Sequence, residues 1–360
     1  MQKKTSKQEL HPPAPPSSSS SVTLTPSDSS SCIGYDSSEK LITITCGSTT
    51  LSELDKQLND GNVPCKENKN DDTANNNDDD NHNAKVWLLN AGLLIDKGAA
   101  LYINSTDTKW LKIIADGTTA YGIHVLGTLK IDSVKITSWD PSTNDYLKFK
   151  FEILSDRQFE ESGIDAIPRP YIITEQGETG TTDITNSELA YLGYACGGGC
   201  SGLSYYAGEG SVIEGNNIHN NRFGFYSNGA SKLILQHNNV HHNFMYGFDP
   251  HTGTHDVIIR NNIVHDNGAM GIICSLNCYN VTIENNEVYN SQGSGIMFSR
   301  NMTDSVVRNN IVHNEDNCIL VSQSHSVKST VIGLQAARLL SSCFIIRLTI
   351  WCMTTSSQIL

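Results

Sequence analysis

The feature that most constrains this chain is a repeat of 22 to 24 residues in its second half. Glycines mark the repeat at Gly202, Gly224, Gly247, Gly271 and Gly295. Asparagines run in step at Asn216, Asn238, Asn262, Asn286 and Asn310, each followed three residues later by His219, His241, His265, Tyr289 and His313. A period of this length, with short apolar runs and no helical spacing, is typical of a solenoid of strands.

Each repeat contains a short, mostly β-branched run that asparagine follows, such as Val257–Ile259 or Val281–Ile283. Such runs favour strands, and asparagine tolerates the left-handed backbone of a sharp corner. The sequence therefore predicts an all-β fold, a right-handed parallel β-helix whose coils stack ~4.8 Å apart. A leucine-rich repeat lacks support, because no leucine framework recurs. Equivalent positions should form columns, and we interpret the asparagine and histidine columns as structural.

The same pattern suggests the boundaries of the parts. Residues 85–326 are predicted to form the β-helix, and residues 327–360 a divergent C-terminal tail without asparagine pairs. Residues 1–31 are polar, with a proline-rich patch and a serine run, so we expect a disordered tail. That segment contains no apolar core of a secretory signal. Residues 32–84 are predicted as an N-terminal cap region.

Within the cap region we expect a strand at Leu41–Thr45, an amphipathic helix at Leu51–Leu58 and a solvated Asn/Asp-rich loop at 66–84. The loop fits no EF-hand calcium site. Pro168 and Pro170 predict a projecting loop before a strand at Tyr171–Thr174. The first coils are expected from the apolar runs Val86–Leu94, Ala99–Ile103, Trp110–Ile114, Ile123–Leu126 and Leu129–Ile136.

Composition excludes some partners. The 360-residue chain has a formal net charge of -13, which argues against nucleic acid, and it lacks an 18-residue apolar run that could span a membrane. Ten cysteines include the pairs Cys196/Cys200 and Cys274/Cys278, neither with a second pair at zinc spacing. We expect both pairs to be disulfides, which implies an oxidising compartment. Cys32 and Cys46 bracket the first strands, and sequons at Asn104, Asn280 and Asn301 agree with secretion.

The stretch Tyr246–Asp256 departs from the repeat. Aligned on glycine, the column of Asp249 contains Ser204, Tyr226, Ile273 and Met297. The column of His251 contains Tyr206, Asn228, Ser275 and Ser299. Because these ionisable groups occur in one coil only, stacking of like residues in a column does not explain them, and they are candidate functional residues. Because strand residues alternate between faces, Asp249 and His251 can point the same way.

Tyr246-Gly-Phe-Asp-Pro-His251 resembles the motif of mannuronan C5-epimerases, which convert mannuronate to guluronate within alginate. The longer stretch Asp249–Asp256, with Val264–Gly268 and Gly271–Ser275, resembles their brown-algal branch; so do Asn104–Lys112, Ile131–Lys135 and Ile296–Asn301. The resemblance covers roughly residues 32–326. It implies a right-handed parallel β-helix, a secreted or cell-wall location, alginate as substrate, and catalytic roles for Tyr246, Asp249 and His251.

Those three residue types suit the chemistry. Epimerisation removes the C5 proton next to a carboxylate and returns one from the other face, once the carboxylate charge is neutralised. Histidine suits proton transfer near neutral pH, a phenol suits proton donation, and a carboxyl with a raised pKa can neutralise by sharing a proton. Which of Tyr246 and His251 is acid and which is base stays open.

The motif also departs from bacterial relatives. Some of them carry a further acidic residue where Ser275 stands, and an acidic residue directly after the histidine, where this chain has Thr252. The Thr252-Gly-Thr254 stretch that follows the histidine can bring His255 or Asp256 to the position of that acidic residue, and we therefore predict both as substrate-binding groups.

An acidic protein needs local cations to bind a polyanion. Arg222 and Arg300 are the candidates, whereas Arg260 shares a column with Gln236, Glu284 and Arg308 and is interpreted as part of a solvated ladder. We expect no required cofactor and no metal ligand set; bound calcium could contribute, but no motif demands it.

Two other functions remain open at this point. A polyuronate lyase shares the first half of the reaction and then expels the 4-O-linked sugar. A non-catalytic polysaccharide-binding solenoid is disfavoured by the isolated Tyr/Asp/His cluster.

Overall fold

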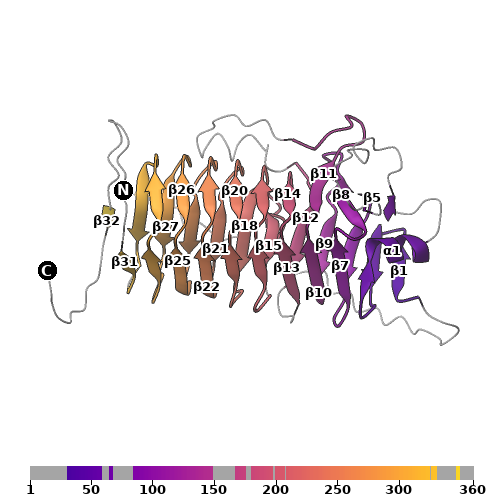
Figure 1. Ribbon diagram of the computed structural model, residues 1–360, viewed down its shortest axis with the longest axis horizontal. Coiled ribbons are helices and arrows are strands. Elements are labelled where there is room, and N and C mark those ends of the chain that lie inside the picture. The colour runs from indigo at the N-terminus through magenta and orange to yellow at the C-terminus, as the bar shows by residue number, and fades with distance from the viewer. Residues whose placement is uncertain are drawn as a thin grey trace, which may run out of the picture. The chain divides into compact units, whose positions relative to one another are not determined.

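A computed structural model describes residues 31–58, 65–67, 84–148, 167–175, 180–197, 199–206, 208–324, 326–330 and 346–348. The predictions of an N-terminal tail, most of the Asn/Asp-rich loop and most of the C-terminal tail lie outside these residues. The described residues from Cys32 onward form a stack of coils in which three sheets run along the axis (Figure 1).

Sheet A carries the candidate site. In spatial order it contains β1 (Ile33–Asp36), β2 (Leu41–Ile44), β6 (Gly92–Ile95), β9 (Gly122–Val125), β12 (Tyr171–Thr174), β15 (Gly202–Tyr205), β18 (Phe223–Asn228), β21 (Phe248–His251), β24 (Ile272–Ser275), β27 (Ser294–Ser299), β30 (Asn317–Ser322) and β32 (Ile346–Leu348). Neighbours pair in parallel, except β1 with β2.

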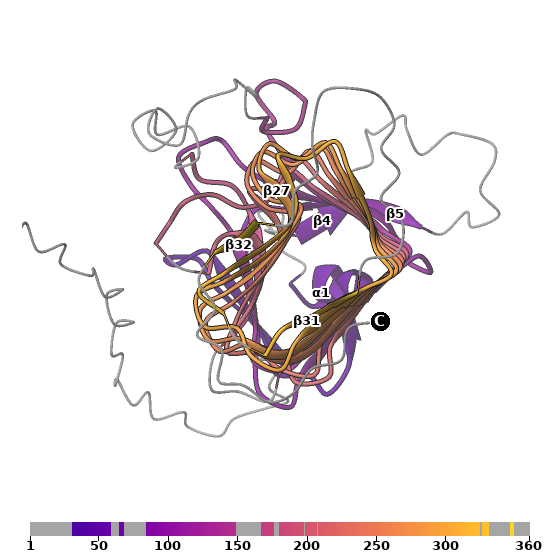
Figure 2. The ribbon, with the colours of Figure 1, turned by 90° about the vertical axis from the view of Figure 1, so that its left-hand side faces the viewer.

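Sheets B and C complete each coil, as the end view in Figure 2 shows. Sheet B contains β3 (Thr49–Thr50), β7 (Ala100–Asn104), β10 (Thr128–Asp132), β13 (Thr181–Thr185), β16 (Val212–Glu214), β19 (Ile234–Gln236), β22 (His255–Arg260), β25 (Tyr279–Glu284), β28 (Val306–Arg308) and β31 (Lys328–Thr330). Sheet C contains β4 (Cys65–Glu67), β5 (Lys85–Leu89), β8 (Thr108–Ile114), β11 (Lys135–Trp139), β14 (Glu188–Ala190), β17 (Asn217–His219), β20 (Asn239–His241), β23 (Ile263–His265), β26 (Glu287–Tyr289) and β29 (Ile311–His313).

The predicted parallel β-helix is thus confirmed, and its asparagine column is a buried ladder. The side-chain amide of Asn262 donates to Asn286 Oδ1 at 2.9 Å and to the Leu235 carbonyl at 2.9 Å, while its own Oδ1 accepts from Asn238 Nδ2 at 3.0 Å. The preceding corner residue, Asn261, has φ of 55°. One asparagine therefore makes the left-handed corner, and the next fills the core behind it.

The predicted histidine column is an aromatic stack along sheet C. Rings of His219, His241, His265, Tyr289 and His313 follow one another at 4.9–5.0 Å and nearly parallel. Burial, with neighbouring imidazoles, lowers the pKa of His241 to about 4. The ring of His241, the second in the stack, is therefore uncharged at neutral pH, which avoids charge repulsion with the rings on either side.

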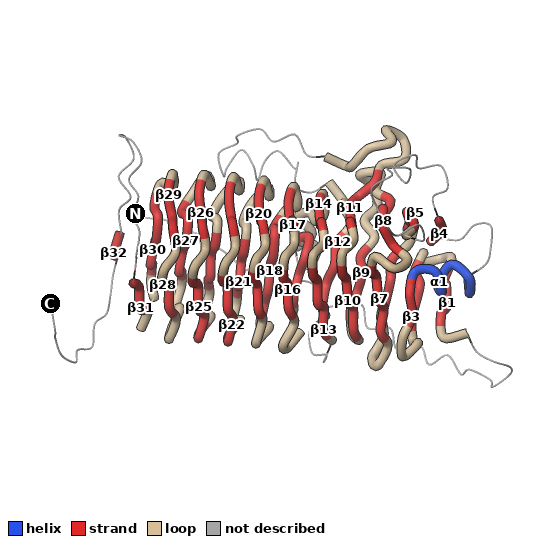
Figure 3. Tube along the Cα trace, viewed as in Figure 1, coloured by secondary structure: helices blue, strands red, loops and turns tan. Residues whose placement is uncertain are grey.

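The predicted cap helix is α1 (Leu51–Leu58), the helix drawn in Figure 3. Thr50 and Glu53 form a capping box: the Thr50 amide donates to Glu53 Oε2 at 2.9 Å, and the Glu53 amide to Thr50 Oγ1 at 3.4 Å. Leu51 and Leu54 are fully buried in the core cluster. The helix thus covers the apolar end of the stack, where strand edges would otherwise be exposed.

Two apolar runs expected as single strands each contain a corner. Val86–Leu94 divides into β5 and β6, and Leu129–Ile136 into β10 and β11, where Ser133 has φ of 56°. No helix in the described part of the chain has the length and apolarity that crossing a membrane requires.

Candidate active site

The candidate site lies on the outward face of sheet A, around β21. Strand alternation sends Phe248 into the core, where it is fully buried, and turns Asp249 and His251 to the other face. The register matches the columns expected from glycine spacing: Tyr226 pairs with Asp249, and Asn228 and Ser275 flank His251. The repeat therefore determines which residues adjoin the two ionisable groups.

Asp249 is buried although it points away from the core. Its side chain belongs to a residue only 3% exposed, and nothing among the described residues forms a hydrogen bond with its Oδ1. Burial raises the pKa of this carboxyl from 3.8 to about 8, with Arg300 and Arg222 acting in the opposite direction. Asp249 is thus a protonated acid at neutral pH, and its buried Oδ1 has no hydrogen-bond partner among the described residues.

His251 is held as a neutral ring with one nitrogen accessible. Its Nδ1 lies 2.5 Å from Thr252 Oγ1, and its Nε2 lies 3.3 Å from Nη2 of Arg300. A guanidinium only donates, so Nε2 carries the lone pair and Nδ1 the proton. Burial, followed by the charge of Arg300, lowers the pKa of His251 to about 4. This arrangement is that of a general base at neutral pH.

Arg300 reaches the site from two coils away. It follows β27 in a left-handed conformation, with φ of 61°, and also donates from Nη2 to Ser275 Oγ at 3.1 Å. Arg222 comes from the coil before β21 and lies over the Phe223 ring at 4.5 Å. The charges of Arg300 and Arg222 both oppose the rise in the pKa of Asp249 that burial causes, so both side chains act on this carboxyl.

Two phenols flank the pair. Tyr246 stands just before β21, with its ring 5.0 Å from that of Phe223. Tyr226, which is not among the predicted site residues, has its ring 5.8 Å from that of His251, and burial raises its pKa well above the usual value. Its column position beside Asp249 was the available signal.

His255 and Asp256 lie past the next corner, on sheet B. His255 Nδ1 is 2.7 Å from Asp256 Oδ2, the His255 ring stacks on Tyr279 at 4.5 Å, and Asn280 donates to Asp256. Nothing in the structure tests the predicted contact of His255 and Asp256 with substrate, which stays a prediction.

The interpretation of Arg260 as part of a ladder is confirmed. Arg260 donates to Gln236 Oε1 at 2.8 Å, next to the Arg308–Glu284 pair.

The expected disulfide Cys196–Cys200 is present, as is Cys32–Cys46, but the expected Cys274–Cys278 pair is wrong. Both of its cysteines are buried free thiols. Cys274 points into the core from β24, and Cys278 Sγ contacts the Ser275 carbonyl at 3.1 Å instead of sulfur. In contrast, Gly197 and Gly199 take positive φ between Cys196 and Cys200, which lets that loop fold back.

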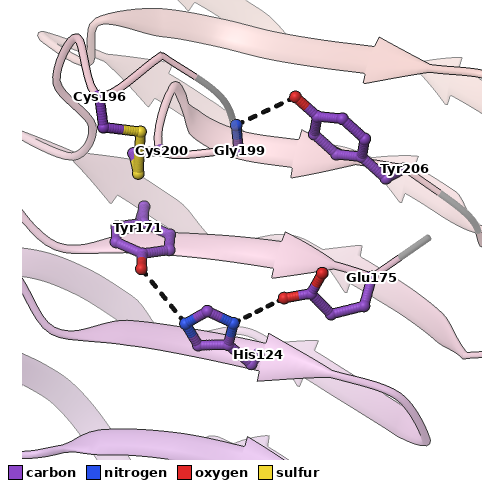
Figure 4. Close-up of a disulfide and its surroundings, with 7 residues drawn as sticks. All are labelled: His124, Tyr171, Glu175, Cys196, Gly199, Cys200 and Tyr206. Carbon is purple, nitrogen blue, oxygen red and sulfur yellow. Dashed lines mark hydrogen bonds and ion pairs between the residues drawn. A yellow bond between two sulfur atoms is a disulfide. The ribbon is translucent and has the colours of Figure 1, made fainter. Parts of the chain in front are cut away.

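A second polar cluster occupies the same face nearer the N-terminus (Figure 4). His124 of β9 has Nδ1 2.6 Å from Glu175 Oε1 and Nε2 3.2 Å from Tyr171 Oη. Beside it, the disulfide loop donates from the Gly199 amide to Tyr206 Oη at 3.0 Å. Outward tyrosines on β12, after β15 and on β18 thus continue the polar face from this cluster toward Asp249.

Comparisons with known proteins agree with this architecture. A family model described as a right-handed β-helix region matches residues 201–333. No curated protein matches the chain in sequence. Among solved structures, the periplasmic alginate epimerase AlgG superposes with a TM-score of 0.63 at 20% identity, over 80% of this chain and 63% of that one. A double mutant of AlgG gives 0.64 at 21%, with the same coverage.

The chain therefore spans less than two thirds of the AlgG structure that it resembles. At this identity the likeness establishes the fold, a right-handed parallel β-helix.

Proposed function

We propose that this protein is a mannuronan C5-epimerase, which converts mannuronate to guluronate residues within an alginate chain. The observation that carries the proposal is the pairing, on one outward face, of a buried acid with a neutral histidine that faces an arginine: Asp249, His251 and Arg300. The motif Tyr246–His251 and the likeness in fold to an alginate epimerase support the substrate class.

The first requirement of the reaction is to neutralise the uronate carboxylate. Protonated Asp249 can donate a hydrogen bond to the substrate carboxylate from Oδ1, which has no partner in the described structure, and the Arg300 guanidinium supplies a positive charge to the same site. Both donors act where negative charge grows as the C5 proton leaves. Some bacterial members of the epimerase family carry an acidic residue at this level, whereas here Arg300 donates to the uncharged Ser275 hydroxyl.

The second requirement is a base and an acid on opposite faces of the sugar. We assign the base to His251 Nε2, with Thr252 Oγ1 holding the other ring nitrogen. The Tyr226 ring adjoins the base, so we assign it to the same side of the sugar as His251. Tyr246, at the entrance of β21, is assigned to return a proton from the other face.

We also infer that the protein works outside the cytoplasm, in an extracellular matrix or cell wall. Two disulfides support an oxidising compartment. The partner is then the polysaccharide itself, bound through Arg222 and Arg300 despite the net charge of -13. No cofactor is required by this scheme.

The test is to incubate the protein with polymannuronate and record proton NMR spectra over time. We expect guluronate signals to appear without unsaturated sugar ends and without shortening of the chain. Unsaturated ends would instead identify a lyase, because β-elimination leaves a double bond. Tight binding to an unchanged polymer would identify a non-catalytic binding protein.

A further inference from the structure

Two corner residues on sheet C break the repeat in adjacent coils. The residue after each ring of the aromatic stack is Asn220, Asn290 or Asn314 in three coils, all with φ of 55–57°. In the two coils between, it is His242, with φ of 53°, and Asp266, with φ of 52°. Stacking accounts for the rings of His241 and His265, but it does not account for an imidazole and a carboxylate at these corners.

The corners bring three metal-ligating side chains together. One ligand atom each from His242, His265 and Asp266 lies within 4.8 Å of the other two. His242 belongs to the coil of β20 and β21, whereas His265 and Asp266 belong to the coil of β23 and β24. The group therefore joins two coils across about one strand spacing.

The hydrogen bonds around His265 leave a ligand position unsatisfied. Its Nε2 lies 3.1 Å from Asn239 Oδ1, an orientation supported by the contact of Asn239 Nδ2 with Asn217 Oδ1 at 3.3 Å. That nitrogen therefore carries the proton, and Nδ1 of the neutral ring is a lone pair. Nδ1 nevertheless lies 2.6 Å from Asp266 Oδ2, another acceptor. A second proton shared by the two atoms, or a cation bound by both, would remove this conflict between two acceptors.

A metal ion fits this donor set. Ligating histidines typically donate their other N–H to an oxygen acceptor, as His265 does to Asn239. The neighbouring His241 has Nε2 3.0 Å from Asn217 Oδ1, so this nitrogen carries the proton. His241 Nδ1 then accepts from His242 Nδ1 at 2.8 Å, which leaves His242 Nε2 with a lone pair for a metal ion. Mixed imidazole and carboxylate donors favour Zn²⁺ and similar transition ions over Ca²⁺ or Mg²⁺.

We propose that His242, His265 and Asp266 bind a divalent transition-metal ion, with Zn²⁺ as the best match, at the corner between two coils. Three protein ligands leave a fourth tetrahedral position for water. The partly exposed Asp266 carboxylate, 2.6 Å from His265 Nδ1 in this structure, would have to move back to give the ligand spacing of about 3.3 Å that tetrahedral zinc needs.

The site has a structural consequence for the candidate active site. His242 and Tyr246 are four residues apart in the segment that enters β21. An ion held at His242 ties that segment to the following coil, in addition to the backbone bonds from Ala269 to Met245 and from Gly247 to Met270. The metal is thus a clamp and takes no part in the proposed proton transfers.

The neighbouring coils supply the test variants. His242→Asn and Asp266→Asn each introduce the residue that adjacent coils carry at the same corner with the same backbone conformation. His237→Asn is the matched control: His237 lies at the corner between β19 and β20 of the same coil, where Asn261, Asn285 and Asn309 are its equivalents. All three changes should preserve the fold, which circular dichroism and the melting temperature check.

Calorimetric titration of chelator-treated protein with ZnCl₂ alone measures the binding, independently of any polysaccharide. We expect one ion per chain, a melting temperature that rises with zinc, and affinity reduced at least tenfold in His242→Asn and in Asp266→Asn but unchanged in His237→Asn. Failure of the wild-type protein to bind at 1 mM zinc would overturn the proposal. Equal affinity in the His242→Asn/Asp266→Asn double variant would also overturn it, by locating the ion elsewhere.

Discussion

His251 Nε2 and Arg300 Nη2 lie 3.3 Å apart although the two residues are 49 positions apart in the chain. The contact exists because β21, β24 and β27 are consecutive strands of sheet A, and the Arg300 side chain reaches back over Ser275. The contact gives the histidine a defined tautomer, and the charge of Arg300 adds to burial, the larger cause, in lowering the pKa of His251. The pair is therefore the place where the proposed function is most sharply testable.

Replacing His251 with asparagine should abolish catalysis without harming the fold. The preceding coil carries Asn228 at the same register, so the change restores a residue that the sheet already accommodates. We expect activity on polymannuronate to fall by at least ~10²-fold, the usual size of a lost general base. Solvent-deuterium incorporation at C5 measures the proton transfer, with the melting temperature as control. Normal deuterium uptake in a folded variant would show that His251 does not move the proton.

The rate should depend on pH through His251 and Asp249. His251 must be neutral, so kcat/KM rises as pH passes about 4; Asp249 must be protonated, so kcat/KM declines as pH passes about 8. In Asp249→Asn, which cannot ionise, the alkaline decline should vanish while the remaining rate is lower by up to ~10²-fold. An alkaline limb near 8 that survives in this variant would contradict the assignment to Asp249.

Removing the charge of Arg300 should shift both limbs in the same direction. Arg300 lowers the pKa of His251 and of Asp249, so Arg300→Gln should raise both values and move the whole profile to higher pH. The maximal rate should also decrease, by ~10²-fold or more, because a donor to the developing charge is lost. Arg308→Gln, in the solvated ladder of sheet B, is the control and should leave the profile unchanged.

The asparagine ladder should be costly to interrupt. Asn262→Ala leaves the Leu235 carbonyl and the Asn238 amide without their partner in a buried position, which should destabilise the fold by roughly 2–4 kcal/mol. Ile263→Thr, at a neighbouring side chain that is 43% exposed, should change stability by less than about 0.5 kcal/mol. Denaturant unfolding of the two variants measures the difference, and equal effects would remove the structural role of the ladder.

The cysteines should divide into two chemical classes. Alkylation of denatured, unreduced protein should modify Cys274 and Cys278, and mass mapping should find Cys196 joined to Cys200. In the native protein Cys278 should react slowly, because burial raises its pKa to about 12. A Cys274–Cys278 disulfide in the mapped peptides would contradict the structure.

Alignment of the repeats on their glycines predicted the neighbours of Asp249 and His251 correctly, because a parallel stack preserves register from coil to coil. Tyr226 was not predicted as a site residue, because its place in the column of Asp249 indicates proximity but does not reveal the ring contact with His251. The corner at Ser133 was missed because serine is a weaker turn signal than asparagine. The Cys274/Cys278 pair was misjudged because sequence spacing does not reveal that both side chains belong to the core.

Parallel stacking also governs how the site can be lost. Tyr226, Asp249 with His251, Ser275 and Arg300 come from four successive coils, and each coil of a solenoid is held mainly by its two neighbours. Unravelling from the C-terminal end would therefore release Arg300 first, while the strand of Asp249 and His251 is still paired. Asp249 and His251 would then remain in place without the cation that Arg300 supplies. Local unfolding at the C-terminal end would therefore abolish the proposed activity before the rest of the β-helix unfolds.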